Sequence, residues 1–301
     1  MRPAILADHA VIDRKLRLPD VTLVCVDTVN PNRALYAVAR SMAWVDFGAA
    51  VLITRADHGL SGLPSGLQVV ADDTIRSLHD YSRFMLRGLS PYVRTSHCLI
   101  VQWDGFVLDP SMWSDEFLKL DYIGPLWERH HRREPCSCTG GFSLRSRRLL
   151  AALLDERIES RQPEDVCIAL EYRGYLERHH RIRYADRSTA CRFAMEDLYL
   201  TPSAFGFHGV HNLLCILSAE ELEDFMTNAP AGAFAGFRMR RFIKHALRQH
   251  EIELARRALS RRRSGRKLDL SDLRLWARLY CARWAWRRIA PAAAGRAPAT
   301  R

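Results

Sequence analysis

Four apolar runs rich in β-branched residues constrain this chain more than any other feature. They occupy residues 21–26, 50–54, 67–70 and 98–103. Helical spacing of apolar residues separates them, at residues 34–45 and again at residues 79–92. Near-continuous apolar runs are typical of strands buried on both faces, and their alternation with helices predicts a mostly parallel sheet. We therefore expect an α/β fold with a Rossmann-like central sheet flanked by helices.

The second half of the chain carries shorter elements. Strands are expected at residues 121–124 and after the turn that opens residues 140–146, and a polar loop at residues 128–135. Helices are expected at residues 147–154 and from Pro163 to about residue 176.

Composition excludes several classes of protein. The chain has 301 residues, of which 48% are hydrophobic and 26% charged, so it can form a sizeable core and is not wholly disordered. It shows no long uncharged apolar run and no apolar leader, which predicts a cytoplasmic protein. The eight cysteines lie mostly in apolar runs and are expected to be reduced, buried thiols.

Charge divides the chain unevenly. Residues 236–301 contain 19 Lys and Arg against 4 Asp and Glu, whereas residues 1–235 carry a small net negative charge. We expect a catalytic or binding body at residues 1–235, a basic helical extension at residues 236–290 and a disordered tail at residues 291–301. Such an extension indicates a polyanionic partner.

Two interpretations of the extension stay open. Arginines and tryptophans share the predicted helix at residues 272–289, as in helices that lie in an anionic membrane interface. That would place the protein at the inner face of the membrane as a peripheral protein. The alternative is a helical hairpin that packs on the body and turns its arginines to solvent.

Two acidic turns follow predicted strands. Asp27 and Thr28 follow the first strand, and Gln102, Trp103 and Asp104 end the fourth. Ligands of parallel sheets bind beyond the carboxyl ends of strands, and an exposed aspartate there can hold a hard cation that bridges phosphates. The alternative for Asp104 is a turn aspartate that caps its own backbone.

Further candidates lie downstream. Glu164 and Asp165, at a predicted helix start, can include a general base or can merely complement the helix dipole. His208, in a Phe-Gly-Phe-His-Gly turn, can bind a metal or serve as a hydrogen-bonded structural residue. Gly140, Gly141 and Phe142 permit close approach of a ligand or form a hairpin turn.

Other signatures exclude classes of function. The residues His130, His131, Cys136 and Cys138 lack the usual zinc spacing, so no zinc site is expected. The chain has no GxSxG, Walker or GxGxxG motif, which argues against serine hydrolases, P-loop enzymes and dinucleotide oxidoreductases.

Several motifs in order resemble one bacterial family. They are LPDVTLVCVD at residues 18–27, DYSRFML at 80–86, VQWDGFVLDP at 101–110, DYIG at 121–124, GGFSLRSRRL at 140–149, PED at 163–165 and FGFHG at 205–209. The chain is similar over roughly residues 18–215 to the DUF5672 family, a glycosyltransferase-like group. The same order of motifs resembles the wider GT-A glycosyltransferases.

That resemblance implies roles for individual residues. Asp104 and His208 would hold Mn²⁺ or Mg²⁺, and Asp165, or else Glu164, would be the catalytic base. Tyr81 and Arg83 would face the donor nucleotide. The other residues that would contact donor or acceptor are Asp27, Thr28, Gln102, Trp103, Gly140, Gly141 and Phe142. The chain departs from the GT-A pattern where Gln102 replaces the first acid of an Asp-x-Asp motif, and where Cys136-Ser-Cys-Thr precedes the glycines.

The resemblance implies a glycosyltransferase. Its donor would be a nucleotide-sugar, and its acceptor a hydroxyl of a glycan, a lipid-linked molecule or a protein, with an inverting, metal-assisted reaction in surface glycan or glycoconjugate synthesis. The alternative is a non-catalytic GT-A-like binding module that uses its arginine-rich extension on a membrane or on RNA. Nucleic acid is the less favoured partner.

Overall fold

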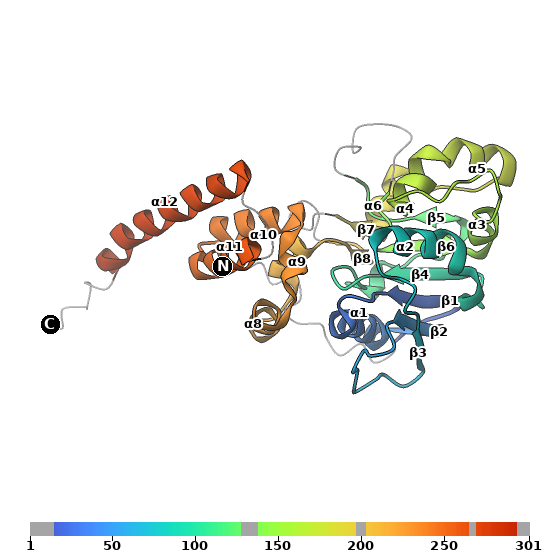
Figure 1. Ribbon diagram of the computed structural model, residues 1–301, viewed down its shortest axis with the longest axis horizontal. Helices are drawn as coiled ribbons and strands as arrows, with labels where there is room; N and C mark the ends of the chain where they lie inside the picture. The colour runs from blue at the N-terminus through green and yellow to red at the C-terminus, as the bar shows by residue number, and fades with distance from the viewer. Residues whose placement is uncertain (1–14, 128–137, 197–202, 265–268, 294–301) are drawn as a thin grey trace. The chain divides into compact units, whose positions relative to one another are not determined.

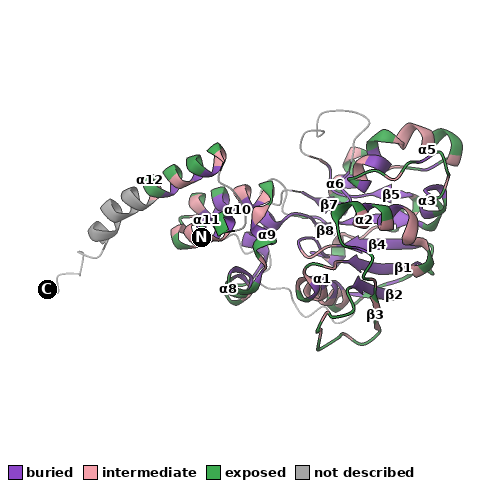
Figure 2. Ribbon diagram, in the orientation of Figure 1, coloured by how far each residue is buried: buried purple, intermediate pink, exposed green. Residues whose placement is uncertain are grey.

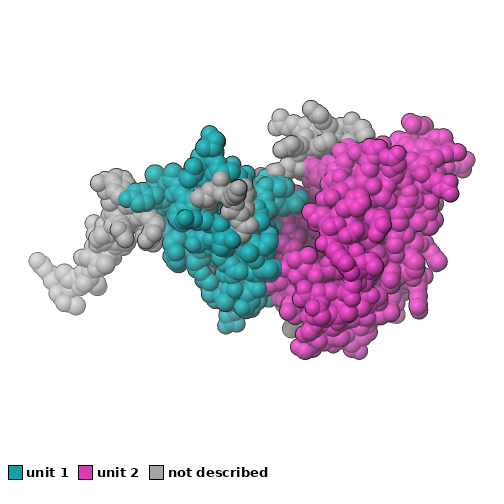
Figure 3. Space-filling view, viewed as in Figure 1, with its two compact units in different colours: residues 1–7, 210–301 teal, residues 8–209 magenta. Residues whose placement is uncertain are grey.

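The computed structural model describes residues 15–127, 138–196, 203–264 and 269–293 (Figure 1). The chain divides into two compact units between Gly209 and Val210 (Figure 3). We call the unit that ends at Gly209 (magenta, unit 2 in Figure 3) the first unit, because it comes first along the chain, and the unit that begins at Val210 (teal, unit 1 in Figure 3) the second unit. The expected boundary at residues 235 and 236 falls inside the second unit. The zinc-type residues His130, His131 and Cys136 and the end of the expected tail lie outside the described residues.

A six-stranded sheet forms the centre of the first unit, in the order β3-β2-β1-β4-β6-β5. Pairing is parallel between β3, β2, β1 and β4, and antiparallel where β6 joins β4 and β5. The strands are β1 Leu16–Val26, β2 Val45–Thr54, β3 Leu67–Ala71, β4 His97–Val101, β5 Tyr122–Ile123 and β6 Ser143–Ser146. The predicted mostly parallel sheet with flanking helices is confirmed.

The middle strands are buried on both faces, as their apolar runs predict. Every residue of β4 is buried, and Leu23, Val24 and Cys25 of β1 are fully inaccessible (Figure 2). At roughly 25 cal/mol for each Å² of apolar surface removed from water, this burial supplies the main force that assembles the sheet.

Two strands begin earlier than the sequence predicts. β1 starts at Leu16 rather than at residue 21, and β2 starts at Val45 rather than at residue 50. The added residues Leu16–Leu18 pair with β2 alone, and a register shift separates them from Thr22, around Pro19. The early parts of β1 and β2 pair only with each other, so they have a neighbouring strand on one side only. Their residues alternate between buried and exposed, and they therefore lack the continuous apolar run by which a fully buried strand is recognised.

Two expected long helices are interrupted. The helix predicted at residues 79–92 is α2 Leu78–Arg83, a π-helical turn at Phe84–Gly88 and a 3₁₀ turn at Ser90–Tyr92. A Cβ on Gly88 would lie 2.8 Å from the Phe84 ring, so glycine permits the wider turn. The helix predicted from Pro163 likewise comprises α4 Glu164–Val166, a π-helical turn at Cys167–Glu171 and α5 Arg173–His180.

The other helices of the first unit frame the sheet. Pro31 begins α1 as expected, because its missing N–H is not needed in a first helical turn. A second, two-stranded sheet pairs β7 with β8 in parallel. The bounds are α1 Pro31–Trp44, α3 Arg147–Ala152, α6 Arg187–Phe193, β7 Ala194–Met195 and β8 Gly206–Phe207, with 3₁₀ turns at Pro110–Met112 and Asp115–Lys119.

The second unit is helical where it is described. Its elements are a 3₁₀ turn at Val210–Asn212, α7 Leu213–Ile216, α8 Ala219–Asn228, α9 Ala231–Ala235, α10 Phe237–Arg248, α11 Ile252–Ser264 and α12 Leu270–Ala293. A buried ion pair between Arg262 and Asp272 joins α11 to α12. Among the described residues, no helix combines the length and apolar character needed to cross a membrane.

An aromatic cluster ties β8 to the main sheet. The Phe142 ring is fully buried against Phe193 and Phe205, at centroid distances of 5.3 and 5.9 Å. A Cβ on Gly206 would lie 2.1 Å from Cζ of Phe142. Glycine at residue 206 is therefore a packing requirement.

We predict that Gly206→Ala lowers the free energy of unfolding by about 1–3 kcal/mol, because the confined Phe142 ring must shift to admit a methyl group. Urea denaturation measures the change. Gly232→Ala is the matched control, since a Cβ there meets nothing within 4 Å. Equal stability of Gly206→Ala and the wild-type chain would contradict the packing argument.

Candidate functional site

Three segments meet at one edge of the sheet because of its topology. β1 and β4 are parallel neighbours, so the turns that follow them, at Asp27 and Asp104, lie at the same edge. β6 runs antiparallel to β4, with Ile100 opposite Ser143, so the residues that precede β6 reach that edge too. The edge thus collects Gly140 and Gly141 beside the two acidic turns.

The Asp27 turn is held by its own carboxylate. Oδ1 of Asp27 accepts hydrogen bonds from the backbone N–H groups of Val29 and Asn30, at 2.8 and 2.7 Å. Burial raises the pKa of Asp27, these two donors oppose the rise, and the negative charge of Asp104 raises it again. Thr28 donates through Oγ1 to the carbonyl of Ile75. Asp27 and Asp104 are therefore within electrostatic reach of each other.

Asp104 sits in a tight turn. Gln102 and Gly105 exchange backbone hydrogen bonds across it, and the N–H of Gly209 donates to the Asp104 carbonyl at 2.7 Å. Trp103 in the same turn is partly exposed, whereas Asp104 is 7% exposed. The contact from Gly209 brings the residues that follow β8 onto this turn.

His208 lies between two carboxylates. Its Nε2 is 3.7 Å from Oδ1 of Asp104, and its Nδ1 is 3.1 Å from Oε2 of Glu196. Glu196 follows β7 and His208 follows β8, and these strands pair in parallel. A carboxylate on one imidazole nitrogen fixes the ring and leaves the other nitrogen facing its partner, the arrangement common around metal-bound histidines.

The glycines let the backbone approach this imidazole. A Cβ on Gly141 would lie 2.1 Å from Nε2 of His208, and a Cβ on Gly105 would lie 3.2 Å from Cδ2 of the same ring. Any side chain at residue 141 would therefore displace His208. The next residue, Phe142, points its ring into the core and offers no exposed surface to a ligand.

Two carboxylates meet the preceding glycine. Asp165 accepts the N–H of Gly140 on Oδ2 at 3.1 Å and its neighbour Val166 N–H on Oδ1 at 2.8 Å. A Cβ on Gly140 would lie 2.8 Å from Oε1 of Glu164. Gly140 and Gly141 are consecutive, so one peptide unit joins the Glu164–Asp165 pair to the His208–Asp104 pair.

Burial separates the two carboxylates of the pair. Asp165 is partly exposed, whereas Glu164 is 5% exposed and accepts a hydrogen bond from Nη2 of Arg145 at 3.3 Å. Burial raises the pKa of Glu164, and the Arg145 charge opposes the rise. Glu164 is therefore a buried partner of Arg145, whereas the carboxylate of Asp165 can be reached by solvent.

Arg145 is a charged residue within a buried strand. Its side chain is fully buried on β6, and Nε donates to Oγ of Ser143 at 3.1 Å. Among the described residues, its Nη1 has no hydrogen-bond partner. An incompletely satisfied buried pair contributes little net stability, although removal of one member leaves an uncompensated charge.

Tyr81 and Arg83 occupy different environments. The Tyr81 hydroxyl accepts a hydrogen bond from Nε2 of Gln102 at 2.8 Å. Burial raises the pKa of Tyr81 well above its ordinary value, and the negative charge of Glu164 adds to the rise. Through Gln102, Tyr81 therefore joins the residues gathered at this edge, which we call the edge cluster: Asp27, Gln102, Asp104, Gly140, Gly141, Glu164, Asp165, Glu196 and His208. Arg83, two residues on, is exposed and lies 3.9 Å from a carboxylate oxygen of Asp80.

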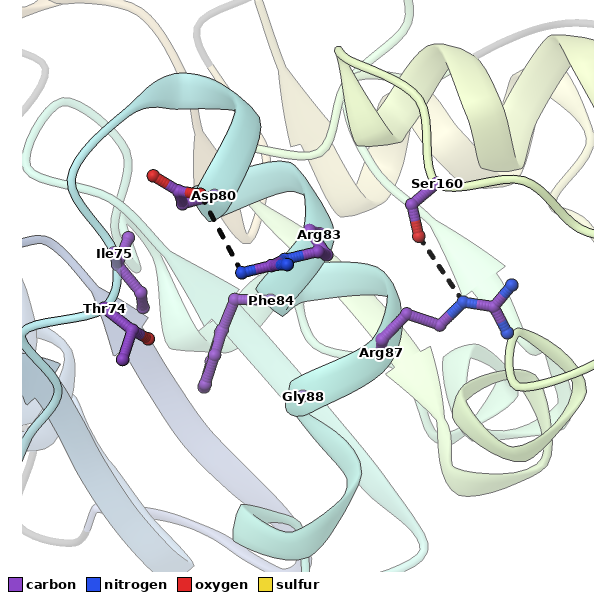
Figure 4. Close-up of a pocket in the computed structure, with 8 residues that line it drawn as sticks. All are labelled: Thr74, Ile75, Asp80, Arg83, Phe84, Arg87, Gly88 and Ser160. Carbon is purple, nitrogen blue, oxygen red and sulfur yellow. Dashed lines mark hydrogen bonds and ion pairs between the residues drawn. The ribbon is translucent and has the colours of Figure 1, made fainter.

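Arg83 lines a separate cavity of about 290 Å³ (Figure 4). Its walls come from the loop after β3, from α2 with its π-helical turn, and from one residue of a distant loop: Thr74, Ile75, Asp80, Arg83, Phe84, Arg87, Gly88 and Ser160. Nε of Arg87 donates a hydrogen bond to Oγ of Ser160 at 3.4 Å. The cavity shares no lining residue with the edge cluster.

Most of the cluster lies in a segment that matches a family of sequences. Residues 65–208 match the family described as Protein of unknown function (DUF5672). No curated protein matches the chain. The DUF5672 segment ends at His208 and includes Glu196, Arg145 and every predicted site residue except Asp27 and Thr28.

The DUF5672 segment contains two site residues that the sequence reasoning missed. Glu196 is recognisable only from the pairing of β7 with β8, each two residues long. Arg145 stands in a predicted strand, where an arginine is normally expected to point to solvent. Glu196 contacts His208, and Arg145 contacts Glu164; the sequence motifs identify both of these partners.

A metal site is incomplete in the part of the DUF5672 segment that the structure describes. Among the described residues, no three His, Cys, Asp or Glu side chains form a group able to hold a metal ion. Asp104 and His208 supply one carboxylate oxygen and one imidazole nitrogen 3.7 Å apart, which are two of the ligands that a divalent cation needs, and the nitrogen suits Mn²⁺ better than Mg²⁺.

We predict that Arg145→Met destabilises the protein by about 3–5 kcal/mol, because it leaves Glu164 buried without its counter-charge. A native pKa raised above the unfolded value means that the folded state binds the proton more tightly, so unfolding free energy falls as pH rises. The loss should therefore be smaller at low pH, where Glu164 is neutral, than at neutral pH.

The double variant Arg145→Met/Glu164→Leu is the control for this prediction. Since it removes both charges, it should regain most of the lost stability and show no such pH dependence. Urea denaturation at several pH values makes the comparison. Equal losses in the single and double variants at every pH would contradict the ion-pair account.

Proposed function

We propose that the protein is a glycosyltransferase that moves a sugar from a nucleotide-sugar donor to a hydroxyl acceptor. One observation carries this proposal. The contacts of two consecutive residues, Gly140 and Gly141, connect a partly exposed carboxylate, Asp165, to the Asp104–His208 pair at the carboxyl edge of a mostly parallel sheet. Such an edge is where α/β proteins bind phosphorylated ligands.

The proposed donor contacts follow from position. The Asp27–Thr28 turn and the Gln102–Trp103 turn flank Asp104, and Tyr81 is fixed behind them by Gln102. Arg83 lies in the separate cavity and Phe142 in the core, so neither is included in the proposed donor site. A Mn²⁺ or Mg²⁺ ion held by Asp104 and His208 would supply positive charge to the donor diphosphate.

Asp165 is the proposed base. Each of its two oxygens accepts one backbone N–H, Oδ2 from Gly140 and Oδ1 from Val166. These two hydrogen bonds fix the carboxylate, and each oxygen keeps a lone pair that can accept a proton. In the reaction, Asp165 takes the proton of the acceptor hydroxyl, and that oxygen forms a bond to the anomeric carbon. The bond from this carbon to the phosphate oxygen breaks, and its electron pair leaves with the nucleoside diphosphate. The displacement inverts the anomeric centre.

Glu164 is proposed as a positioning residue. Its burial and its bond to Arg145 hold the first turn of α4, from which Asp165 projects. A base must lie within hydrogen-bond reach of the proton it takes, so a fixed helix start is useful for such a group.

We predict that Asp165→Asn lowers turnover at least about tenfold while donor binding is unchanged, because the amide cannot accept the hydroxyl proton. The assay follows sugar transfer or donor hydrolysis across UDP-, GDP-, ADP- and dTDP-sugars. The control is Asp46→Asn. Asp46 is an exposed aspartate near the start of β2, at the ends of the parallel strands opposite to the candidate site. Transfer at the wild-type rate by Asp165→Asn would rule out this base.

The metal assignment has its own test. We predict that Mn²⁺ tightens binding of nucleoside diphosphates to the wild-type chain, as measured by calorimetry. The increment should vanish in Asp104→Ala, and Glu196→Gln should weaken the affinity for Mn²⁺ by about 10–100-fold, since an outer carboxylate orients the histidine. Asp46→Ala should behave as wild type. Identical donor affinity with and without Mn²⁺ would refute the assignment.

The alternative function has a distinct outcome. A chain that binds nucleotide-sugars but neither transfers nor hydrolyses any of them would be a non-catalytic binding module. The transferase proposal is favoured because Asp165 is partly exposed and binds the peptide of Gly140, whose neighbour Gly141 meets His208.

A further inference from the structure

One face of the helical unit collects cations from two helices. On α10, Arg241, Lys244 and Arg248 follow i, i+3, i+7 spacing and share one side of the helix. On the neighbouring α12, Arg278 lies close enough for its charge to act on Lys244. Lys244, Arg248 and Arg278 are exposed.

These exposed cations differ from the other arginines of the unit. Within the described residues, no carboxylate pairs with Lys244, Arg248 or Arg278. Elsewhere in the unit, pairs neutralise the charge: Arg240 with Asp269, Arg256 with Glu253, Arg257 with Glu223 and Arg262 with Asp272. Partial desolvation by neighbouring side chains lowers the pKa of Lys244, although the residue as a whole is exposed, and the charges of Arg278 and Arg248 lower it further. The cations thus repel one another, which an anionic partner would relieve.

Exposed apolar side chains occupy the adjoining side of α12. Leu273 is 53% exposed and Tyr280 is 76% exposed, at i, i+7 spacing with Ala277 between them. Arg274 and Arg278 form the next stripe round the helix. The opposite side, with Asp272, Leu275 and Leu279, is buried within the unit. Figure 2 shows exposed residues along this first half of α12.

We propose that the outward face of α12, together with Lys244 and Arg248 of α10, binds an anionic phospholipid surface. A helix that presents leucine and tyrosine beside arginine can lie in the plane of the headgroups, with its apolar side chains inserted and its cations on lipid phosphates. Exposed leucines contribute nothing to phosphate contacts along a nucleic acid, which is why a lipid surface fits better. The proposal does not depend on the transferase activity.

The test is co-sedimentation of the full chain with large vesicles. Phosphatidylcholine vesicles that contain about 30 mol % phosphatidylglycerol should bind it, and phosphatidylcholine alone should not. Each of Lys244→Gln and Arg248→Gln should lower the partition coefficient about fivefold. Leu273→Ser/Tyr280→Ser should also lower it, although the charge is unchanged. Arg256→Gln, which removes a paired arginine of α11, is the control and should bind as wild type.

Three outcomes of the vesicle experiment would overturn the proposal. They are absence of binding to the anionic vesicles, equal loss in Arg256→Gln and Lys244→Gln, and wild-type vesicle binding by Leu273→Ser/Tyr280→Ser. A single-stranded RNA oligonucleotide serves as competitor. Tighter binding to RNA than to vesicles, insensitive to Leu273 and Tyr280, would assign the surface to nucleic acid instead. Circular dichroism of each variant checks that the helices persist.

Discussion

The close approach of the Gly140–Gly141 backbone to charged side chains is the constraint on which the candidate site depends. No side chain fits at either residue, because Glu164 stands over the first and the His208 ring over the second. These two glycines link a loop before β6, the start of α4 and the segment after β8. Residues from distant parts of the DUF5672 segment are therefore brought together by one short stretch of backbone.

The arrangement concentrates charge where the protein can tolerate it least. Buried Asp104 and Glu196 flank His208, buried Glu164 pairs with Arg145, and the charge of Asp104 acts on Asp27. Buried carboxylates near like charges are costly, and sites of this kind are enriched in functional regions. The apolar interior of β1 and β4, which neighbours this edge, supplies stability that such a site lacks. The candidate site and the core that stabilises the fold thus occupy different parts of the same sheet.

The sequence predicts the sheet better than it predicts the site. Strands buried on both faces leave continuous apolar runs, so β1 to β4 were identifiable, whereas the one-sided start of β1 at Leu16 was not. A π-helical turn depends on local packing, as of Phe84 on Gly88, and leaves no periodic signal.

The site residues divide in the same way. The pairing of His208 with Asp104 followed from family resemblance, whereas Glu196 and Arg145 required the tertiary contacts. Phe142 follows two glycines and was expected at a ligand, and the structure shows its ring fully buried in the core. Motifs identify which segments matter, but the direction of each side chain is set by packing between segments.

The thiols of the chain add a practical consequence. Cys25, Cys98, Cys138, Cys167 and Cys215 are buried, and burial raises the pKa of Cys98 to about 12, so these sulfurs resist alkylation in the native fold. Cys281 is exposed, one residue beyond Tyr280 on α12. Cys191 is half-buried, so Cys281 is the most exposed of the described thiols and offers an attachment point for an environment-sensitive dye, positioned to report whether that helix enters an apolar medium.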